Sequence, residues 1–189
     1  SSRDTKRMLA YSSVEHMGIL ALGVGLGGVG VFSALFHALN HSLCKTAMFL
    51  VAGTFLASFR TRQISRLGGA IHSLPVAGTV WVAGFLALTG TPPFSPFLSE
   101  LGILRAGLEV SPWIAVFYLA CLAAAFVGMS RGVLGVALGP PVLLAPVRES
   151  PGKSLPPLLL VLLALALGLT VPGWLLDALG QAAVLVGVK

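Results

Sequence analysis

The chain has 189 residues, of which 56% are hydrophobic and only 10% are charged, and its net charge is +6. A soluble domain carries about 25% charged residues, so this composition excludes a soluble globule, and its apolar content excludes a disordered chain. The only cysteines, Cys44 and Cys121, lie in apolar runs, which excludes a disulfide-stapled secreted domain. The sequence therefore predicts an all-α polytopic membrane protein.

The basic residues fall in the short gaps between apolar runs. This distribution is typical of membrane topology signals. Nucleic-acid binders instead gather Lys and Arg on one solvated face, so we expect no nucleic-acid partner. The chain lacks an initiator Met and opens directly into a charged segment. We therefore expect a fragment of a longer protein.

A helix needs roughly 20 apolar residues to cross a bilayer. Five apolar runs have about this length or more. They are residues 8–26, 31–57, 75–108, 112–138 and 155–171. A turn rich in glycine, from 23 to 30, separates the first two runs. We expect three spans within residues 1–110, and two further spans with an apolar tail within residues 111–189.

Five crossings place the start of the chain and the gaps at 58–73 and 139–154 on one side of the membrane. These three segments carry Arg3, Lys6, Arg7, Arg60, Arg62, Arg66, Arg148 and Lys153. The opposite side holds the glycine turn, Glu109 and Lys189. The positive-inside rule then predicts a multi-pass protein of the inner (plasma) membrane, with the start of this fragment in the cytoplasm.

The third run, 75–108, exceeds the length of one ordinary crossing, and prolines interrupt its middle. Proline removes a hydrogen-bond donor and breaks a helix, so Gly90, Pro92 and Pro93 are predicted to divide this span. Broken helices in a membrane are tolerated where protein buries them or where they line a wet cavity. The break is therefore either a kink that serves packing or part of an ion path.

Six ionisable side chains fall within the predicted spans. They are Glu15, His16, His37, His41, Lys45 and Glu100. A charge at the centre of a membrane helix costs about 2.5 to 3.5 kcal/mol on insertion scales. Such residues usually face the interior of the bundle and mark ion or proton paths.

His37, His41 and Lys45 are spaced four residues apart, so they lie on one face of a helix. Histidine and lysine both bind and release protons, and the stripe with its mid-span lysine predicts a proton relay. The alternative for a single histidine is a hydrogen-bonded core residue. Glu100, in the broken span, is either a carboxylate that loads and releases a proton or a static ion pair with Lys45.

Glu15 and His16 are adjacent in the first span, near its cytoplasmic end. They form either an entry group for protons or a packing contact near the helix start. No segment has the ligand spacing of a zinc or iron–sulfur site, so we expect neither a metal nor a cofactor. Any redox chemistry is then expected on another subunit.

Four motifs occur in an order that resembles a known family. They are DTKRMLAYSS (4–13), NHSLCK (40–45), the loop at 61–69, and GTPPF with FLSE (90–100). The chain resembles the antiporter-like, proton-translocating membrane subunits of respiratory complex I, membrane-bound hydrogenases and multisubunit cation/proton antiporters. Residues 12–18 are similar to the component F branch of hydrogenase 4, which is related to a formate hydrogenlyase subunit.

The resemblance implies an inverted-repeat fold, with residues 1–110 as the core of the second repeat. It implies that Lys45 is the central-axis lysine, that Glu100 is the ionisable residue of the broken helix, and that His41 is a neighbour on the polar axis. His16 matches a histidine of family members. The departure from the family is the missing first repeat, without which this chain alone cannot make the full channel.

The function implied is proton translocation driven by a partner hydrogenase-like redox module, with other membrane subunits and the lipid bilayer as further partners. Three alternatives stay open. The chain is a subunit of complex I, a subunit of a sodium/proton antiporter, or a membrane anchor of a hydrogenase that conducts nothing.

Overall fold

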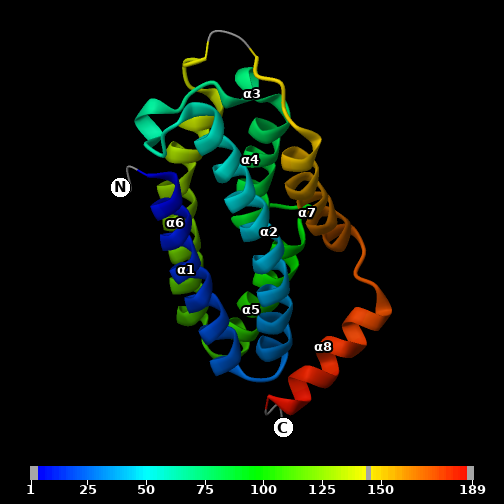
Figure 1. The fold of residues 1–189 in the computed structure, drawn as a ribbon. Coiled ribbons are helices and arrows are strands. Elements are labelled where there is room, and N and C mark those ends of the chain that lie inside the picture. The colour runs from blue at the N-terminus through cyan, green and yellow to red at the C-terminus, as the bar shows by residue number, and fades with distance from the viewer. Residues whose placement is uncertain (1–3, 144–145, 187–189) are drawn as a thin grey trace.

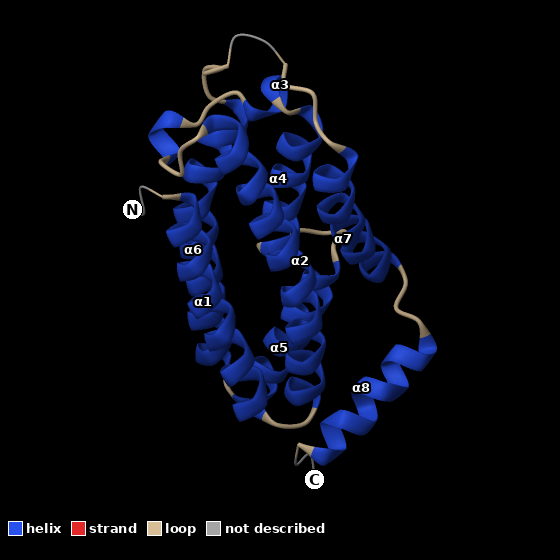
Figure 2. Ribbon diagram, in the orientation of Figure 1, coloured by secondary structure: helices blue, strands red, loops and turns tan. Residues whose placement is uncertain are grey.

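The computed structural model describes residues 4–143 and 146–186, and these are almost entirely helical (Figures 1 and 2). The helices are α1 (Thr5–Leu26), α2 (Val29–Phe59), α3 (Ala70–Ser73), α4 (Pro75–Leu88), α5 (Ser95–Val110), α6 (Pro112–Leu138), α7 (Pro151–Leu169) and α8 (Gly173–Leu185), with a 3₁₀ turn at Ile64–Arg66. Arg3 and Lys189, which entered the charge count, lie outside the described residues.

The predicted fold class is confirmed. By length and composition, four helices of the described chain can cross a membrane, namely α1, α2, α6 and α7. The third predicted span is divided into α4 and α5, which are separated by residues 89–94. The last span begins at Pro151 rather than near Leu155, because proline is well tolerated in the first turn of a helix.

The expected glycine-rich turn is shorter than residues 23–30. Only Gly27 and Gly28, with φ of 74° and 47°, form the turn. Gly23 lies inside α1 and Gly30 inside α2, where each makes room for the other helix. A Cβ added to Gly23 would lie 2.9 Å from the Cβ of Ala34, so these glycines serve close packing of α1 on α2.

The main hydrophobic core surrounds α4. Trp81 and Phe85 of α4 pack with Phe55 of α2, and all three are 2% exposed or less. The indole Nε1 of Trp81 donates to the backbone oxygen of Val133 on α6, at 3.3 Å. Figure 1 shows α4 enclosed by α2, α6 and α7. The first half of the broken span is therefore fixed by three neighbouring helices.

Hydrogen bonds connect the loops at one end of the bundle. The backbone N of Thr5 donates to the oxygen of Arg62 at 3.0 Å. The carboxylate of Glu149 accepts from the backbone N of Val76 at 2.7 Å and of Ala77 at 2.9 Å, so it caps the first turn of α4. The start of the described chain and both basic loops thus lie at the same end (Figure 1), as the charge count predicts.

Candidate functional site

The break between α4 and α5 is built around Gly90. Its φ of 61° lies in the left-handed region, which glycine adopts without steric cost. A Cβ at this position would collide with the carboxylate of Glu100. The glycine therefore permits both the turn of the chain and the close approach of the acidic side chain from α5.

Helix α7 closes the break from the other side. A Cβ added to Gly168 would collide with the backbone oxygen of Pro93 and would lie 2.6 Å from the carbonyl carbon of Phe94. Helix α7 thus packs against Pro93 and Phe94, of which Phe94 is buried, whereas Gly90 and Thr91 are partly buried and Pro92 and Pro93 stay exposed. Gly168 was not among the predicted site residues, because its sequence neighbours are only apolar.

Two buried histidines join three helices. The Nδ1 of His16 on α1 lies 2.9 Å from the Nε2 of His37 on α2. The Nδ1 of His37 lies 2.9 Å from the hydroxyl of Ser99 on α5. His16 is 3% exposed, and the other two side chains are no more exposed than this. The sequence predicted both histidines, and Ser99, which extends the row to the broken span, is an addition.

The hydrogen-bond network assigns the direction of these contacts. The hydroxyl of Ser99 donates to the backbone oxygen of Pro96 at 2.8 Å, which uses its single proton. Ser99 is therefore assigned as the acceptor of the Nδ1–H of His37. In neutral His37 this leaves a lone pair on Nε2, which accepts the Nδ1–H of His16. The result is a directed chain from α1 through α2 to α5.

His41 lies beside the pair, as the four-residue spacing predicts. Its ring centroid is 4.5 Å from that of His16 and 6.4 Å from that of His37. The side chain is half-buried, and its Nδ1 has no hydrogen-bond partner among the described residues. Asn40, one turn away from His37, is fully buried, and neither atom of its amide has a partner there.

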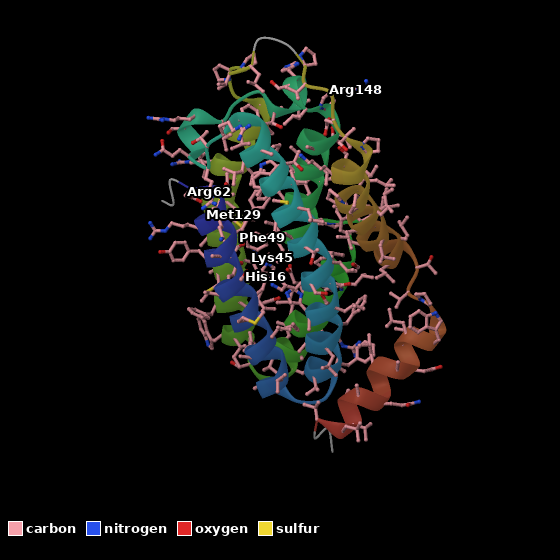
Figure 3. The ribbon with its side chains drawn as sticks, in the orientation of Figure 1. His16, Lys45, Phe49, Arg62, Met129 and Arg148 are labelled. Atoms are coloured by element: carbon pink, nitrogen blue, oxygen red, sulfur yellow. The ribbon has the colours of Figure 1, made fainter. Side chains whose placement is uncertain are left out.

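Lys45 is buried and is held by α1. Its Nζ donates to the backbone oxygen of Leu9 at 2.7 Å and contacts the hydroxyl of Ser12. Within the described residues the single salt bridge joins Arg105 and Glu109, so Lys45 does not form the ion pair with Glu100 that the sequence left open. Figure 3 labels Lys45 and His16 close together in the middle of the bundle.

Glu100 lies with the histidines and is 7% exposed. One ligand atom each from His16, His37 and Glu100 can be chosen so that all three lie within 4.8 Å of one another. The Oε1 of Glu100 has no hydrogen-bond partner in the described part of the chain. The acidic residue of the broken span therefore belongs to the imidazole cluster.

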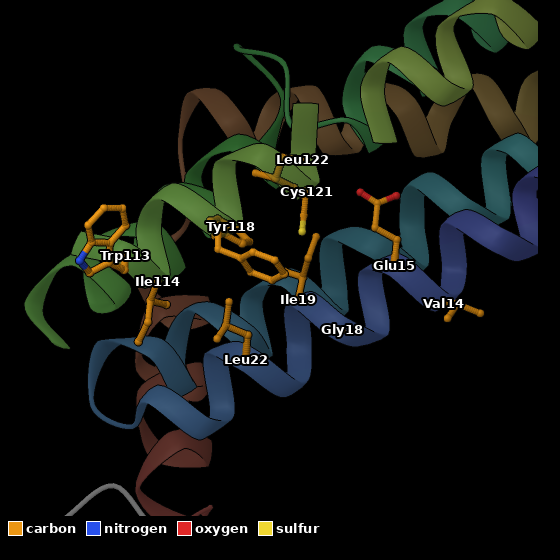
Figure 4. Close-up of a pocket in the computed structure, with 11 residues that line it drawn as sticks. Val14, Glu15, Gly18, Ile19, Leu22, Trp113, Ile114, Tyr118, Cys121 and Leu122 are labelled. Atoms are coloured by element: carbon orange, nitrogen blue, oxygen red, sulfur yellow. The ribbon is translucent and has the colours of Figure 1, made fainter. Parts of the chain in front are cut away.

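Glu15 stands apart from this cluster. Its half-buried side chain lines a cavity of about 660 Å³ between α1 and α6. Figure 4 shows Glu15 near one end of this cavity and Trp113 at the other, with Tyr118 and Cys121 between them. The lining is otherwise apolar apart from the buried hydroxyl of Tyr118, which has no partner among the described residues.

Ser12 and Ser99 were missed by sequence reasoning, although a signal for each was present. Ser12 precedes His16 by four residues, so it shares the face of α1 that meets α2. Ser99 directly precedes Glu100 in the second half of the broken span. Serine is common in membrane helices, and only the packing of three helices shows which hydroxyls meet an ionisable group.

The fold and the cluster define a polytopic helical membrane protein with a broken helix and a buried row of protonatable side chains. The chain belongs to the NADH:quinone oxidoreductase/Mrp antiporter transmembrane family, whose model matches residues 1–126. It is 43% identical over 122 residues to a hydrogenase-4 component F homolog from Methylacidiphilum infernorum (isolate V4). That match covers 64% of this chain and 25% of the relative.

Two solved structures share the fold over 98% of this chain. One is the Mrp complex from Dietzia sp. DQ12-45-1b, with a TM-score of 0.89 and 23% identity, and the match covers 43% of its chain. The other is respiratory complex I from Thermus thermophilus, with a TM-score of 0.83 and 28% identity, and the match covers 40% of its chain. The present chain thus spans less than half the length of the proteins it resembles.

Proposed function

We propose that this chain is part of a proton-translocating membrane subunit of a respiratory-type redox complex of the hydrogenase 4 or formate hydrogenlyase kind. The observation that carries the proposal is the buried, directed hydrogen-bond chain from His16 through His37 to Ser99, which ends beside Glu100 at the broken helix. Histidines in direct contact can pass protons without water. The family membership and the similarity to a hydrogenase-4 component F homolog support the type of complex.

The central step is a proton transfer between the two buried histidines. An imidazolium at His16 gives its Nδ1 proton to the Nε2 of His37 and becomes neutral. His37 then carries a proton on each nitrogen. As its Nδ1 proton passes to Ser99, the Ser99 hydroxyl turns from the Pro96 oxygen and gives its own proton to the nearby carboxylate of Glu100, so the serine is neutral before and after.

Lys45 and His41 are proposed to deliver protons to His16, the first residue of the hydrogen-bond chain. The ammonium of Lys45 is anchored on α1 by the oxygen of Leu9 and the hydroxyl of Ser12. His41 lies one turn away on the same face of α2, with a free Nδ1 in the described structure. A proton given up by Lys45 reaches His16 through His41. Movement of Lys45 between α1 and the histidine row then sets when a proton passes.

Protons are proposed to enter from the cytoplasmic side, near Glu15. The basic residues at the loop end of the bundle support a cytoplasmic position for the start of the described chain. Along α1, Glu15 lies between the loop end of the bundle and His16, and it lines the cavity between α1 and α6. The proposed location is the plasma membrane, and the proposed partners are other membrane subunits and a peripheral hydrogenase-like module.

A subunit of complex I or of a sodium/proton antiporter is the second candidate, because the family description covers both kinds of assembly. Affinity purification of the full-length protein from native membranes separates these assignments. A nickel–iron hydrogenase large subunit among the co-purifying proteins supports the hydrogenase assignment. Small membrane proteins alone, together with sodium-dependent transport, support the antiporter.

Replacement of Lys45 tests the conducting role itself. Lys45→Ala in the full-length protein is expected to abolish proton pumping in proteoliposomes while the complex still assembles. Lys6→Ala is the matched control, because Lys6 is exposed at the loop end of α1. Wild-type pumping by the Lys45→Ala complex would contradict the relay and favour a non-conducting anchor.

A further inference from the structure

We propose that His16, His37 and Glu100 form a buried binding site for a divalent transition-metal ion of the Zn²⁺ class. The three residues come from α1, α2 and α5, and all are 7% exposed or less. One ligand atom from each can be chosen within 4.8 Å of the other two. No other group of three His, Cys, Asp or Glu side chains comes as close together in the described parts of the chain.

The distances between the three side chains are close to those of an occupied Zn²⁺ site. Zn²⁺ binds imidazole nitrogen and carboxylate oxygen at about 2.0 to 2.2 Å, which puts tetrahedral ligand atoms about 3.3 Å apart. The Nδ1 of His16 and the Nε2 of His37 are already 2.9 Å apart. Glu100 therefore needs only a side-chain adjustment. The metal takes the place of the Nδ1 proton of His16, and that ring stays neutral by carrying its proton on Nε2 instead.

The donor set selects the metal. Two histidines and one glutamate, with a fourth position for water, form a recognised zinc ligand set. Ca²⁺ requires at least six oxygen ligands and Mg²⁺ a near-ideal octahedral oxygen shell. The cluster offers two nitrogens and a single carboxylate, so it disfavours both of these hard cations.

The surroundings orient the ligands before a metal arrives. Ser99 accepts the Nδ1–H of His37, which leaves Nε2 as the nitrogen that faces His16. Metal-binding histidines are typically oriented in this way by a hydrogen bond to the other ring nitrogen. The Oε1 of Glu100 is buried and has no partner in the described structure, so it loses no existing hydrogen bond when it turns to a metal.

A functional consequence follows, and it rests on the proposed function. The metal would occupy the Nδ1 of His16 and the Nε2 of His37, the two atoms between which the proton is proposed to move. Bound Zn²⁺ would therefore stop proton transport through this subunit. The metal-binding part of the proposal does not depend on this step and is tested separately.

The test uses the full-length protein in its complex, purified in detergent and titrated with Co²⁺, whose visible absorption reports coordination. Wild type is expected to show a saturable signal that Zn²⁺ displaces. His16→Gln, His37→Gln and Glu100→Gln should each weaken Co²⁺ binding at least about tenfold. His72→Gln is the matched control, because His72 is exposed and lies outside the cluster, and it should bind as wild type does.

X-ray absorption at the zinc edge of the loaded wild type tests the site without any variant. Two imidazole nitrogens and one carboxylate oxygen at about 2.0 to 2.2 Å are expected. An oxygen-only shell, unchanged binding in the three ligand variants, or loss of binding in His72→Gln would overturn the site. If Zn²⁺ binds with this shell and proton transport continues, the proposed proton route fails while the metal site stands.

Discussion

The Nδ1 of His16 and the Nε2 of His37 are hydrogen-bonded at 2.9 Å, although 21 residues separate them in the sequence. The two imidazoles lie on different helices, and neither ring has significant contact with solvent. Because Ser99 fixes the proton on the far side of His37, the contact has a defined direction. A buried pair of this kind places a proton acceptor against a proton donor across a helix interface.

His37→Gln removes the residue that we propose receives and passes on the proton. Glutamine can hydrogen-bond but cannot take up a proton and release another from a second nitrogen. We expect the rate of proton transport by the full-length complex to fall about a hundredfold, with assembly retained. His72→Gln serves as the control on an exposed histidine. Transport by His37→Gln at the wild-type rate would show that protons do not pass through this residue.

Gly90→Ala tests the close approach of Gly90, at the break, to Glu100 on α5. Alanine at a φ of 61° costs about 1 to 2 kcal/mol, and its Cβ also meets the Glu100 carboxylate. The matched control is Gly90→Ala in a Glu100→Ala background, in which the carboxylate is absent and only the backbone strain of alanine remains. Gly90→Ala should lower the midpoint of thermal unfolding in detergent more in the wild-type background than in the Glu100→Ala background. Equal shifts would show that contact with Glu100 adds nothing.

Gly168→Ala tests the closure of the break by α7. The added methyl group would collide with the backbone oxygen of Pro93, which has no side-chain freedom with which to yield. We expect destabilisation of about 1 to 3 kcal/mol from overpacking. Gly180→Ala in α8, where nothing lies within 4 Å of the new Cβ, should be neutral or slightly stabilising. Thermal unfolding of both variants measures the difference, and a stable Gly168→Ala would argue against this packing.

Glu149→Gln tests the cap on the first half of the broken span. The carboxylate accepts from the backbone N of Val76 and of Ala77, and its charge is favourable at the N-terminus of α4. Loss of the charge and of one acceptor should cost about 1 kcal/mol of unfolding free energy. Glu109→Gln, which removes an exposed pair with Arg105, should cost about half of that or less. A reversed order would show that Glu149 does not hold this helix end.

The membrane class, the run lengths and the position of the broken helix are all readable from the sequence, because they depend on local composition. Apolar runs define spans, and Pro92 and Pro93 interrupt a run wherever it is placed. The shared face of His37, His41 and Lys45 also follows from helical periodicity within one element. The additional helix α8 was predicted only as an apolar tail, because its 13 residues fall below the length of a crossing.

The partners of the ionisable residues depended on the packing of different helices. The sequence alone left Lys45 free to pair with Glu100, whereas the structure binds Lys45 to α1 and places Glu100 beside His16 and His37. The close approaches at Gly23, Gly90 and Gly168 decide these distances, and a glycine in an apolar run carries no sign of which neighbour it admits. Local chemistry thus determined which side chains can carry protons, and helix packing decided which of them meet.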